Sequence, residues 1–148
     1  MIMASDLIHR ISIAAPAEKI YRALTTEDGI KGWWTTDVKM DAHAGGKAIF
    51  GFENHSVVFE MRIEQLTPPS LVGWKCEHSN SPDWIGTTQE FRLETRPGGT
   101  DGEVLLKFCH GGWKSGGDHR YYCNTTWGHL LVNLKNYAER ALKNPYFT

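Results

Sequence analysis

Hydrophobic and polar residues alternate over most of the first 110 residues, as expected for β-strands with one buried face. In residues 7–13, Ile11 and Ile13 fall on one face of a predicted strand, and Arg10 and Ser12 fall on the other. Strand patterning returns later in the chain and predicts further strands from residue 37 onward, with clear segments at 47–52, 56–66, 72–77, 87–95 and 104–110. Glycine or proline turns separate these segments at 45–46, 67–70 and 97–102.

Two short helices are predicted directly after the first strand, where helical spacing replaces the alternation. Residues 15–24 place Pro16 in a first helical turn, which tolerates proline because its missing N–H would have no partner there. A second helix is expected to begin at Thr26, a hydroxyl cap followed by two acidic residues, and to run into Trp33–Trp34.

The last part of the chain predicts one long helix, from the cap residue Asp118 to about Lys143, where Asn144–Pro145 ends it. Its apolar positions recur at helical spacing and share one wide face. They are Trp127, Leu130, Leu131, Leu134, Tyr137, Ala138 and Ala141. The opposite face is polar and contains Asn133, Lys135, Asn136, Glu139 and Arg140.

The strands that follow the short helices have charged residues on one face, which indicates an antiparallel sheet that is wetted on that side only. These charges can pair between neighbouring strands; they are Glu60, Arg62, Glu64, Glu90, Arg92 and Glu94. The other face needs a cover, and the C-terminal helix is the only predicted segment large enough to provide it. The sequence therefore predicts a single α+β domain over residues 1–148, in which a curved antiparallel sheet wraps around the long C-terminal helix.

Composition excludes several classes of protein. The 148 residues are 41% hydrophobic and 22% charged, which excludes intrinsic disorder, and a formal net charge of −1 provides no basic surface for nucleic acid. No apolar run reaches the ~18 residues that a membrane span needs, and the first residues do not resemble a secretory signal. Three cysteines without a Cys-x-x-Cys pair indicate reduced thiols in the cytoplasm. We expect no metal and no cofactor.

The chain is rich in aromatic residues, with six Trp, six Phe and five Tyr. They suit either a large core or a pocket for a flat, apolar ligand. Both interpretations stay open, because alternation shows which side of a strand faces inward but not how much volume remains there. A pocket would lie between the sheet and the C-terminal helix. Its candidate apolar lining is Phe50, Phe52, Phe59, Trp74, Phe91, Phe108, Trp127, Leu131 and Leu134.

Few polar side chains fall on the inward face, and each needs either a hydrogen-bond partner in the core or the polar end of a ligand. They are His78, Gln89, His110 and the thiol of Cys76. Cys109 and His110 are adjacent on a strand and point to opposite faces, so they cannot form a nucleophile–base pair. The chain contains none of the common catalytic, phosphate-binding or dinucleotide-binding motifs.

Several short strings occur in a characteristic order: Ala15–Leu24, Trp33–Trp34, Gly45–Lys47, Trp84–Thr87, His110–Trp113, and Trp127-x-x-x-Leu131-x-x-Leu134-x-x-Tyr137. In this order and spacing they resemble the helix-grip (START-like, SRPBCC) superfamily over nearly the whole chain. Within it, the chain is most similar to single-domain bacterial homologues of the C-terminal domain of the heat-shock-protein-90 ATPase activator. Family members often have glycine directly before the helix tryptophan, where this chain has Thr126.

The resemblance implies an apolar cavity under the long helix, which relatives use for lipids, polyketides, hormones and other hydrophobic molecules. We therefore expect a binding protein for a small hydrophobic ligand rather than an enzyme. One alternative is a cyclase- or hydrolase-like enzyme acting on an aromatic or polyketide-like substrate, with His110 or His78 as acid–base and Tyr121 or Tyr122 nearby. The other is a module that binds a chaperone through exposed aromatic residues around Trp33, Trp34, Trp84 and Trp113.

Overall fold

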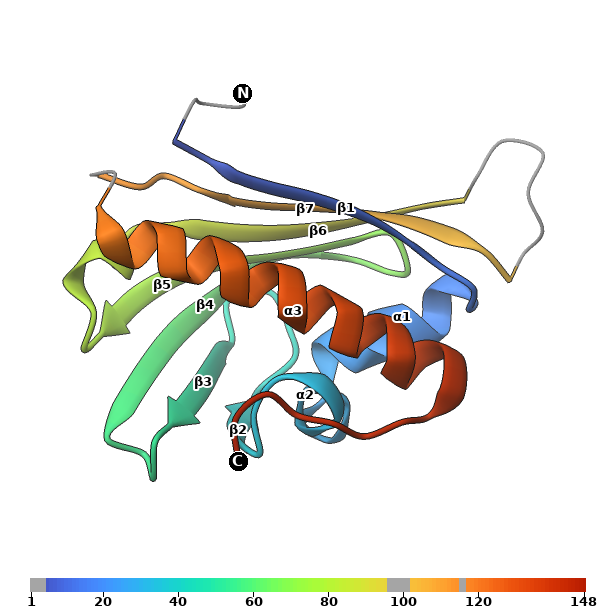
Figure 1. The fold of residues 1–148 in the computed structure, drawn as a ribbon, viewed down its shortest axis with the longest axis horizontal. Helices are drawn as coiled ribbons and strands as arrows, with labels where there is room; N and C mark the ends of the chain where they lie inside the picture. The colour runs from blue at the N-terminus through green and yellow to red at the C-terminus, as the bar shows by residue number, and fades with distance from the viewer. Residues whose placement is uncertain (1–4, 96–101, 115–116) are drawn as a thin grey trace.

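The computed structural model describes residues 5–95, 102–114 and 117–148. This part of the chain forms one seven-stranded sheet with three α-helices and a short 3-10 helix (Figure 1). The strands are β1 (Leu7–Ile13), β2 (Asp37–Met40), β3 (Lys47–Phe52), β4 (Val57–Thr67), β5 (Leu71–Ser79), β6 (Thr88–Thr95) and β7 (Val104–Gly111). The helices are α1 (Ala17–Thr25), α2 (Glu27–Trp33), the 3-10 helix η1 (Pro82–Trp84) and α3 (Asp118–Arg140).

The sheet order is β1-β7-β6-β5-β4-β3-β2, and every neighbouring pair is antiparallel. Figure 1 shows α3 crossing one side of this sheet, with α1 and α2 beneath its C-terminal half. The predicted α+β fold, a curved antiparallel sheet around a long C-terminal helix, is therefore confirmed. Residues 97–101 of the predicted turn at 97–102 lie outside the described residues.

The two short helices meet at Thr26, which ends α1 and caps α2. The Thr26 hydroxyl accepts a hydrogen bond from the Gly29 N–H at 3.0 Å and donates one to the Arg22 carbonyl at 2.8 Å. The predicted cap is confirmed. Pro16 lies one position earlier than predicted, at the N-cap of α1, where its carbonyl accepts from the Lys19 N–H at 3.0 Å.

Helix α3 covers the sheet with the predicted apolar face, but its ends and one polar residue differ from the prediction. Gly117, rather than Asp118, is the N-cap, and the helix ends at Arg140 because Ala141 takes a left-handed conformation with φ of 55°. Asn133 was expected on the polar face and is buried instead, where its amide donates to the Asn144 carbonyl at 3.0 Å. No helix in the described ranges combines the length and the apolar character needed to cross a membrane.

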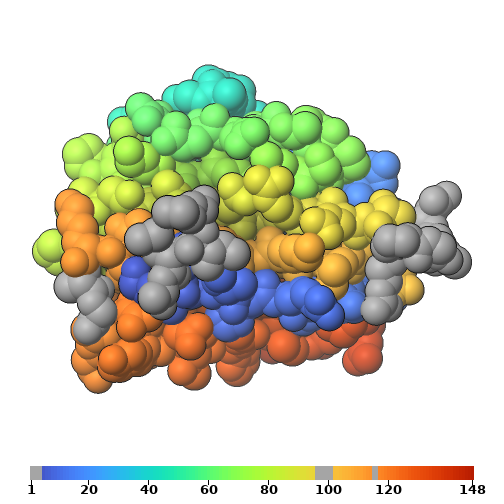
Figure 2. Space-filling model, turned by 90° about the horizontal axis from the view of Figure 1, so that it is seen from above, coloured from blue at the N-terminus to red at the C-terminus, as the bar shows by residue number. Residues whose placement is uncertain are grey.

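The outer face of the sheet is charged, as the alternation predicted. Seen from above, the strands form bands in the sheet order, from green through yellow and orange to blue, with α3 next to β1 (Figure 2). Ion pairs join neighbouring strands on this face: Lys47–Glu60 at 2.8 Å, Arg62–Glu77 at 3.7 Å and Lys107–Glu94 at 3.1 Å. Such exposed pairs stabilise a fold by at most about 1 kcal/mol each, so the inner face supplies most of the stability.

The chain beyond α3 returns along α2 toward the sheet. The Asn144 N–H donates to the Gly32 carbonyl and the Phe147 N–H donates to the Trp34 carbonyl, both at 2.9 Å. Thr35 and Phe147 also form a short parallel bridge. These backbone bonds hold the Phe147 ring against that of Phe52, with 4.7 Å between the ring centroids.

Candidate functional site

Buried hydrophobic side chains occupy the middle of the gap between the sheet and α3. Six of the predicted lining residues are buried there and do not line the cavity described below: Phe50, Trp74, Phe91, Phe108, Leu131 and Leu134. The ring centroids of Trp74 and Phe91 lie 5.1 Å apart, and those of Phe108 and Trp127 lie 4.3 Å apart. These six residues belong to the hydrophobic core of the fold.

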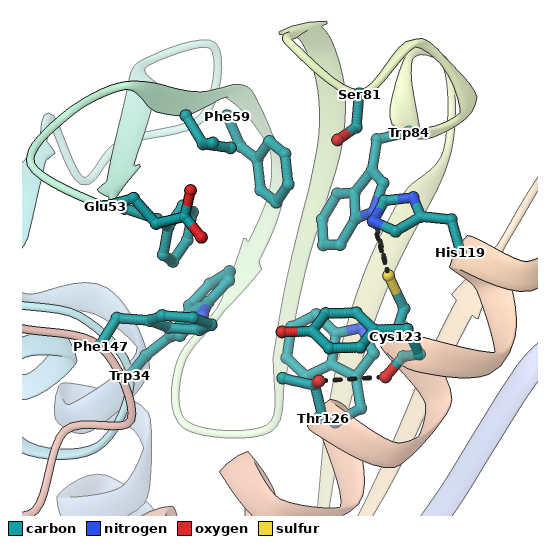
Figure 3. A pocket seen from close by; sticks show the side chains of 13 residues that line it. Trp34, Glu53, Phe59, Ser81, Trp84, His119, Cys123, Thr126 and Phe147 are labelled. Carbon is teal, nitrogen blue, oxygen red and sulfur yellow. Dashed lines mark hydrogen bonds between the residues drawn. The ribbon is translucent and has the colours of Figure 1, made fainter.

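A cavity of about 280 Å³ lies at one end of this gap (Figure 3). It opens between the turn that joins β3 to β4, the η1 segment and the first turns of α3, and the C-terminal segment closes one side. Aromatic rings form most of its wall: Trp34, Phe52, Phe59, Trp84, Tyr122, Trp127 and Phe147. The polar or small side chains that line it are Glu53, Val57, Ser81, His119, Cys123 and Thr126.

Of the residues predicted to line a pocket, Phe52, Phe59 and Trp127 do so. Sequence reasoning did not include Trp34 and Trp84 in the lining, naming them only in the chaperone alternative, and it missed Phe147. Ring contacts join these residues across the wall, with 4.2 Å between the centroids of Phe59 and Trp84. The helix position where relatives often have glycine, Thr126, is half-buried and contributes its side chain to the same wall.

The expected exposed surface of tryptophans does not exist. Trp33, Trp34, Trp84 and Trp113 are all buried. The indole N–H of Trp33 donates to the Ala23 carbonyl at 2.9 Å, which fixes α2 to α1. These four side chains therefore do not form the exposed aromatic surface that the chaperone alternative calls for.

His78 is exposed, so the prediction that it faces inward is wrong. The cause is a β-bulge between β4 and β5. Glu60 pairs with His78, whereas the next residue of β4, Met61, pairs with Cys76, which leaves Glu77 as an extra residue in β5. One extra residue reverses the alternation of side chains beyond it, so His78 moves to the outer face.

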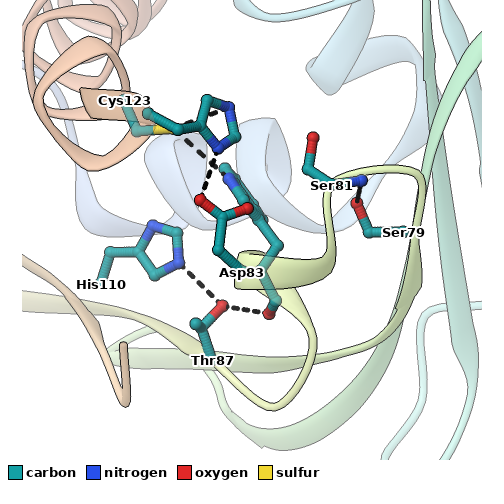
Figure 4. A network of polar contacts seen from close by, with 8 residues as sticks. Ser79, Ser81, Asp83, Thr87, His110 and Cys123 are labelled. Carbon is teal, nitrogen blue, oxygen red and sulfur yellow. Dashed lines mark hydrogen bonds and ion pairs between the residues drawn. The ribbon is translucent and has the colours of Figure 1, made fainter. Parts of the chain in front are cut away.

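His110 and Gln89 are fully buried, as the alternation predicted, but they form a polar network behind the cavity wall, and Figure 4 shows the His110–Thr87 part of it. The Trp127 indole N–H donates to His110 Nδ1 at 3.0 Å. The proton of the neutral ring therefore lies on Nε2, which donates to the Thr87 hydroxyl at 2.9 Å. Thr87 in turn donates to the Trp84 carbonyl at 2.6 Å and accepts from the Gln89 amide at 3.1 Å.

This network makes His110 a structural residue. Burial lowers the pKa of its imidazole to about 3, with a smaller contribution from the nearby His119, so the ring stays neutral at physiological pH. Both ring nitrogens are bonded to protein groups, and the ring does not line the cavity. Neither His110 nor His78 lines this cavity, so neither is placed to act as the acid–base residue of the enzyme alternative there.

A second polar cluster, which the sequence analysis did not identify, lies in the cavity wall itself. His119 Nδ1 lies 2.8 Å from Asp83 Oδ2, and His119 Nε2 lies 3.6 Å from Cys123 Sγ. The Trp84 indole N–H donates to the same sulfur at 3.3 Å. The spacing of four residues between His119 and Cys123 places both on one helix face and was visible in the sequence. Asp83 comes from η1, so only the fold brings it to them.

The three cysteines have free thiols in different surroundings. Cys76 is buried, and burial raises the pKa of its thiol to about 12. Cys109 is half-buried on β7, and burial raises the pKa of its thiol as well.

Among the described residues, no group of three or more His, Cys, Asp or Glu side chains is arranged to hold a metal ion.

Comparison with known structures relates the chain to several solved proteins. It is similar to Aha1 from Colwellia psychrerythraea, which was solved as a dimer in solution. The two are 34% identical with a TM-score of 0.80, over 95% of this chain and 98% of that chain. No curated protein matches the sequence.

Two further structures share the fold at low identity. A protein from Staphylococcus saprophyticus is 16% identical with a TM-score of 0.74, over 94% of this chain and 95% of that chain. An AHSA1-like protein from Aeromonas hydrophila is 19% identical with a TM-score of 0.68, over 90% and 93% of the two chains. Residues 14–139 match the family described as Activator of Hsp90 ATPase homolog 1-like protein. The chain therefore belongs to this family and has the helix-grip fold that its sequence motifs suggested.

Proposed function

We propose that this protein binds a small, largely apolar aromatic molecule in the cavity between η1, the start of α3 and the β3–β4 turn. The observation that carries the proposal is a cavity of about 280 Å³ whose wall consists mainly of aromatic rings. Aromatic walls with a few polar groups are typical of small-molecule sites, because the rings supply apolar contact and the polar groups set the orientation.

The size of the cavity limits the ligand. An apolar cavity of ~150 Å³ is enough to hold benzene. The cavity here has about 280 Å³, which suits one or two rings with a short substituent rather than a long lipid. Glu53, Ser81 and Tyr122 contribute polar atoms to the lining, so one polar end on the ligand is compatible with the site.

The proposal can be tested by filling the cavity from α3. Thr126 is half-buried in the cavity wall, and its hydroxyl bonds only to the Tyr122 carbonyl of its own helix, at 3.0 Å. Thr126→Phe therefore fills the space with little loss elsewhere. Its matched control is Thr125→Phe: Thr125 is exposed and its hydroxyl makes the equivalent bond to the Tyr121 carbonyl at 3.4 Å.

Binding is measured by titrating the protein with 4-phenyl-2-butanone and with two-ring aromatic ketones, and by following the emission of the cavity tryptophans. We expect saturable binding to the wild type and to Thr125→Phe. We expect Thr126→Phe to bind at least about tenfold more weakly, a loss of ~1.4 kcal/mol. Equal affinity in the two variants, or no saturable binding to the wild type, would contradict the proposal.

A chaperone-binding role is a second candidate, and family membership is the observation that favours it. With the four tryptophans buried, such a contact would use exposed side chains such as Tyr121 and Tyr122 at the start of α3. Replacing both by serine should then reduce capture of a purified Hsp90-type chaperone, while unchanged capture would exclude this surface.

The free thiols fit a reducing cytoplasm, so a cytoplasmic location belongs to the same proposal.

A further inference from the structure

Asp83, His119 and Cys123 form a linear chain of contacts that binding of an apolar molecule does not by itself require. Asp83 and Cys123 lie on opposite nitrogens of the same imidazole, at 2.8 and 3.6 Å. Figure 3 shows the sulfur of Cys123 beneath the His119 ring at the cavity, and Figure 4 shows Asp83 beside them. Because the two groups are on opposite sides of the ring, they do not converge on a common point, as ligands of one metal ion would.

We call Asp83, His119 and Cys123 the relay. The groups bonded to the His119 imidazole determine which of its nitrogens holds the proton. A carboxylate can only accept, so the proton of the neutral imidazole lies on Nδ1 and points to Asp83. The Nε2 lone pair then faces the Cys123 thiol and can accept its proton. The same order of groups (carboxylate, imidazole, nucleophile) activates the nucleophile in serine and cysteine hydrolases.

The surroundings of the sulfur also suit a reacting thiol. The Trp84 indole N–H donates to Sγ at 3.3 Å, and a donor aimed at sulfur stabilises the negative charge that develops when the proton leaves. Cys123 is almost inaccessible from the protein surface but lines the cavity, so a molecule reaches its sulfur through the cavity. The site therefore selects apolar reactants over polar thiol reagents.

We propose that Cys123 is a nucleophile that adds to an apolar α,β-unsaturated carbonyl compound held in the cavity, with His119 as its general base and Asp83 as a positioning residue. This inference rests on the proposed function, since the cavity must admit the compound. As sulfur bonds to the β-carbon, the thiol proton passes to His119 Nε2, and the electrons of the C=C bond move onto the carbonyl oxygen as an enolate. His119 then returns the proton to the α-carbon. The net reaction adds S–H across the double bond and needs no other reactant.

The experiment uses 4-phenyl-3-buten-2-one, an aromatic enone that fits the cavity size, and its saturated analogue 4-phenyl-2-butanone, which cannot react. Intact-protein mass spectrometry follows the adduct over time, and peptide mapping locates it. We expect one adduct per chain, on Cys123, and none in Cys123→Ser. Cys109→Ser is the matched control: it removes a half-buried thiol outside the cavity and should leave the rate unchanged.

The relay is tested by His119→Gln and Asp83→Asn, with the binding of 4-phenyl-2-butanone as the check that the cavity is intact. We expect His119→Gln to slow addition about 100-fold, within the range that a positioned general base contributes. Asp83→Asn should slow it about tenfold or more, because the imidazole loses the partner that holds its tautomer.

The pH profile separates base catalysis from a structural role. The titratable side chains near the imidazole are Asp83, Cys123, Tyr122 and His110, and Glu53 lines the same cavity. Burial raises the pKa of the Cys123 thiol to about 11. Without its base the thiol reacts only as thiolate, so the rate in His119→Gln should rise about tenfold per pH unit over the range 7–9. In the wild type the imidazole takes the thiol proton during addition, so the rate should rise much less steeply with pH than in His119→Gln.

The outcomes separate the two proposals. Binding of 4-phenyl-2-butanone without any Cys123 adduct from the enone would overturn the nucleophile and leave the binding function standing. An equal rate and pH slope in wild type and His119→Gln would overturn the relay, as would an adduct formed mainly on Cys109. If 4-phenyl-2-butanone does not bind and 4-phenyl-3-buten-2-one forms no adduct, both proposals are overturned together.

Discussion

Trp127 belongs to the core and to the cavity wall at the same time. Its ring packs against Phe108 and lines the cavity, while its indole N–H is bonded to His110 behind the wall. Trp74 is equally buried in the same aromatic cluster, but its indole N–H has no partner among the described residues. The two tryptophans therefore differ mainly in one hydrogen bond.

This difference predicts unequal costs for the same substitution. Trp127→Phe leaves the buried Nδ1 of His110 without its donor, whereas Trp74→Phe removes an N–H that was already unpaired. We expect Trp127→Phe to lower the free energy of unfolding by ~1–3 kcal/mol more than Trp74→Phe, the usual cost of leaving a buried polar group unpaired. Urea denaturation at pH 7 measures both. Equal costs would show that the bond to His110 contributes nothing.

The buried His110 predicts a loss of stability in mild acid. Its pKa is about 3 in the folded protein and the ordinary 6.5 when unfolded, so between these values only the unfolded chain binds the proton. Unfolding should become easier as the pH falls below 6.5, by at most ~1.4 kcal/mol per pH unit. His110→Asn, which keeps an acceptor for Trp127, should lose this part of the pH dependence. His9, whose pKa is also lowered by burial, acts in the same direction in both proteins.

The low pKa of His110 can also be measured directly in the wild-type protein. The His110 ring should remain neutral in NMR spectra from pH 8 to about 4, well below the ordinary imidazole pKa of ~6.5. Titration of His110 near pH 6 would show that the network does not exclude the charged form.

At the scale of elements, two glycines within helices differ in the space that is available for a side chain. A Cβ on Gly32 of α2 would lie 2.4 Å from the Tyr137 ring of α3, so this glycine allows the two helices to approach. A Cβ on Gly128 of α3 would have only an ordinary contact, 3.7 Å from His9.

The same substitution should therefore change stability in opposite directions. Gly128→Ala should stabilise the protein by ~0.5–1 kcal/mol, because alanine loses less backbone entropy in a helix. Gly32→Ala should destabilise it by ~1–3 kcal/mol, because the added methyl forces α2 away from α3. Thermal unfolding of the two variants and the wild type checks both signs. A rise in the unfolding temperature of Gly32→Ala would contradict the close approach of α2 and α3.

At the scale of the whole molecule, the cavity depends on segments far apart in the chain. The rings of Phe52 and Phe147 meet edge to face in its wall because the C-terminal segment bonds back to Trp34 and Thr36. Trp34 and Phe147 therefore line the same cavity, although they are more than a hundred positions apart in the chain.

Replacing Phe147 should lower the affinity of the cavity for a ligand much more than it lowers the stability of the fold. Phe147→Ala should cost less than the ~3–5 kcal/mol of a fully buried phenylalanine, since Phe147 is only half-buried. Its affinity for 4-phenyl-2-butanone should fall at least about tenfold. Tyr146→Ala is the control, because Tyr146 is exposed and does not line the cavity. Unchanged binding in Phe147→Ala would show that the C-terminal segment is not part of the site.

Local patterns were sufficient for the elements and for much of the core. The alternation in residues 104–110 correctly placed Phe108 and His110 inside, and the hydroxyl of Thr26 correctly marked the start of α2. The pattern failed at His78, because a bulge adds one residue to β5 and reverses the faces beyond it. It also failed at Trp34 and Trp84, since short helices carry no alternation that shows which side is covered.

The amino-acid sequence by itself determined the order of strands and helices, the face that each strand buries and the family, because these follow from periodicity and short motifs within a few residues of each other. Only the tertiary structure decided where the interior is solid and where it is hollow, since volume depends on how rings from distant segments meet. It also decided that Asp83, 36 residues before His119, completes the relay with Cys123. Contacts across such distances depend on the packing of η1 against α3, and no local pattern encodes that packing.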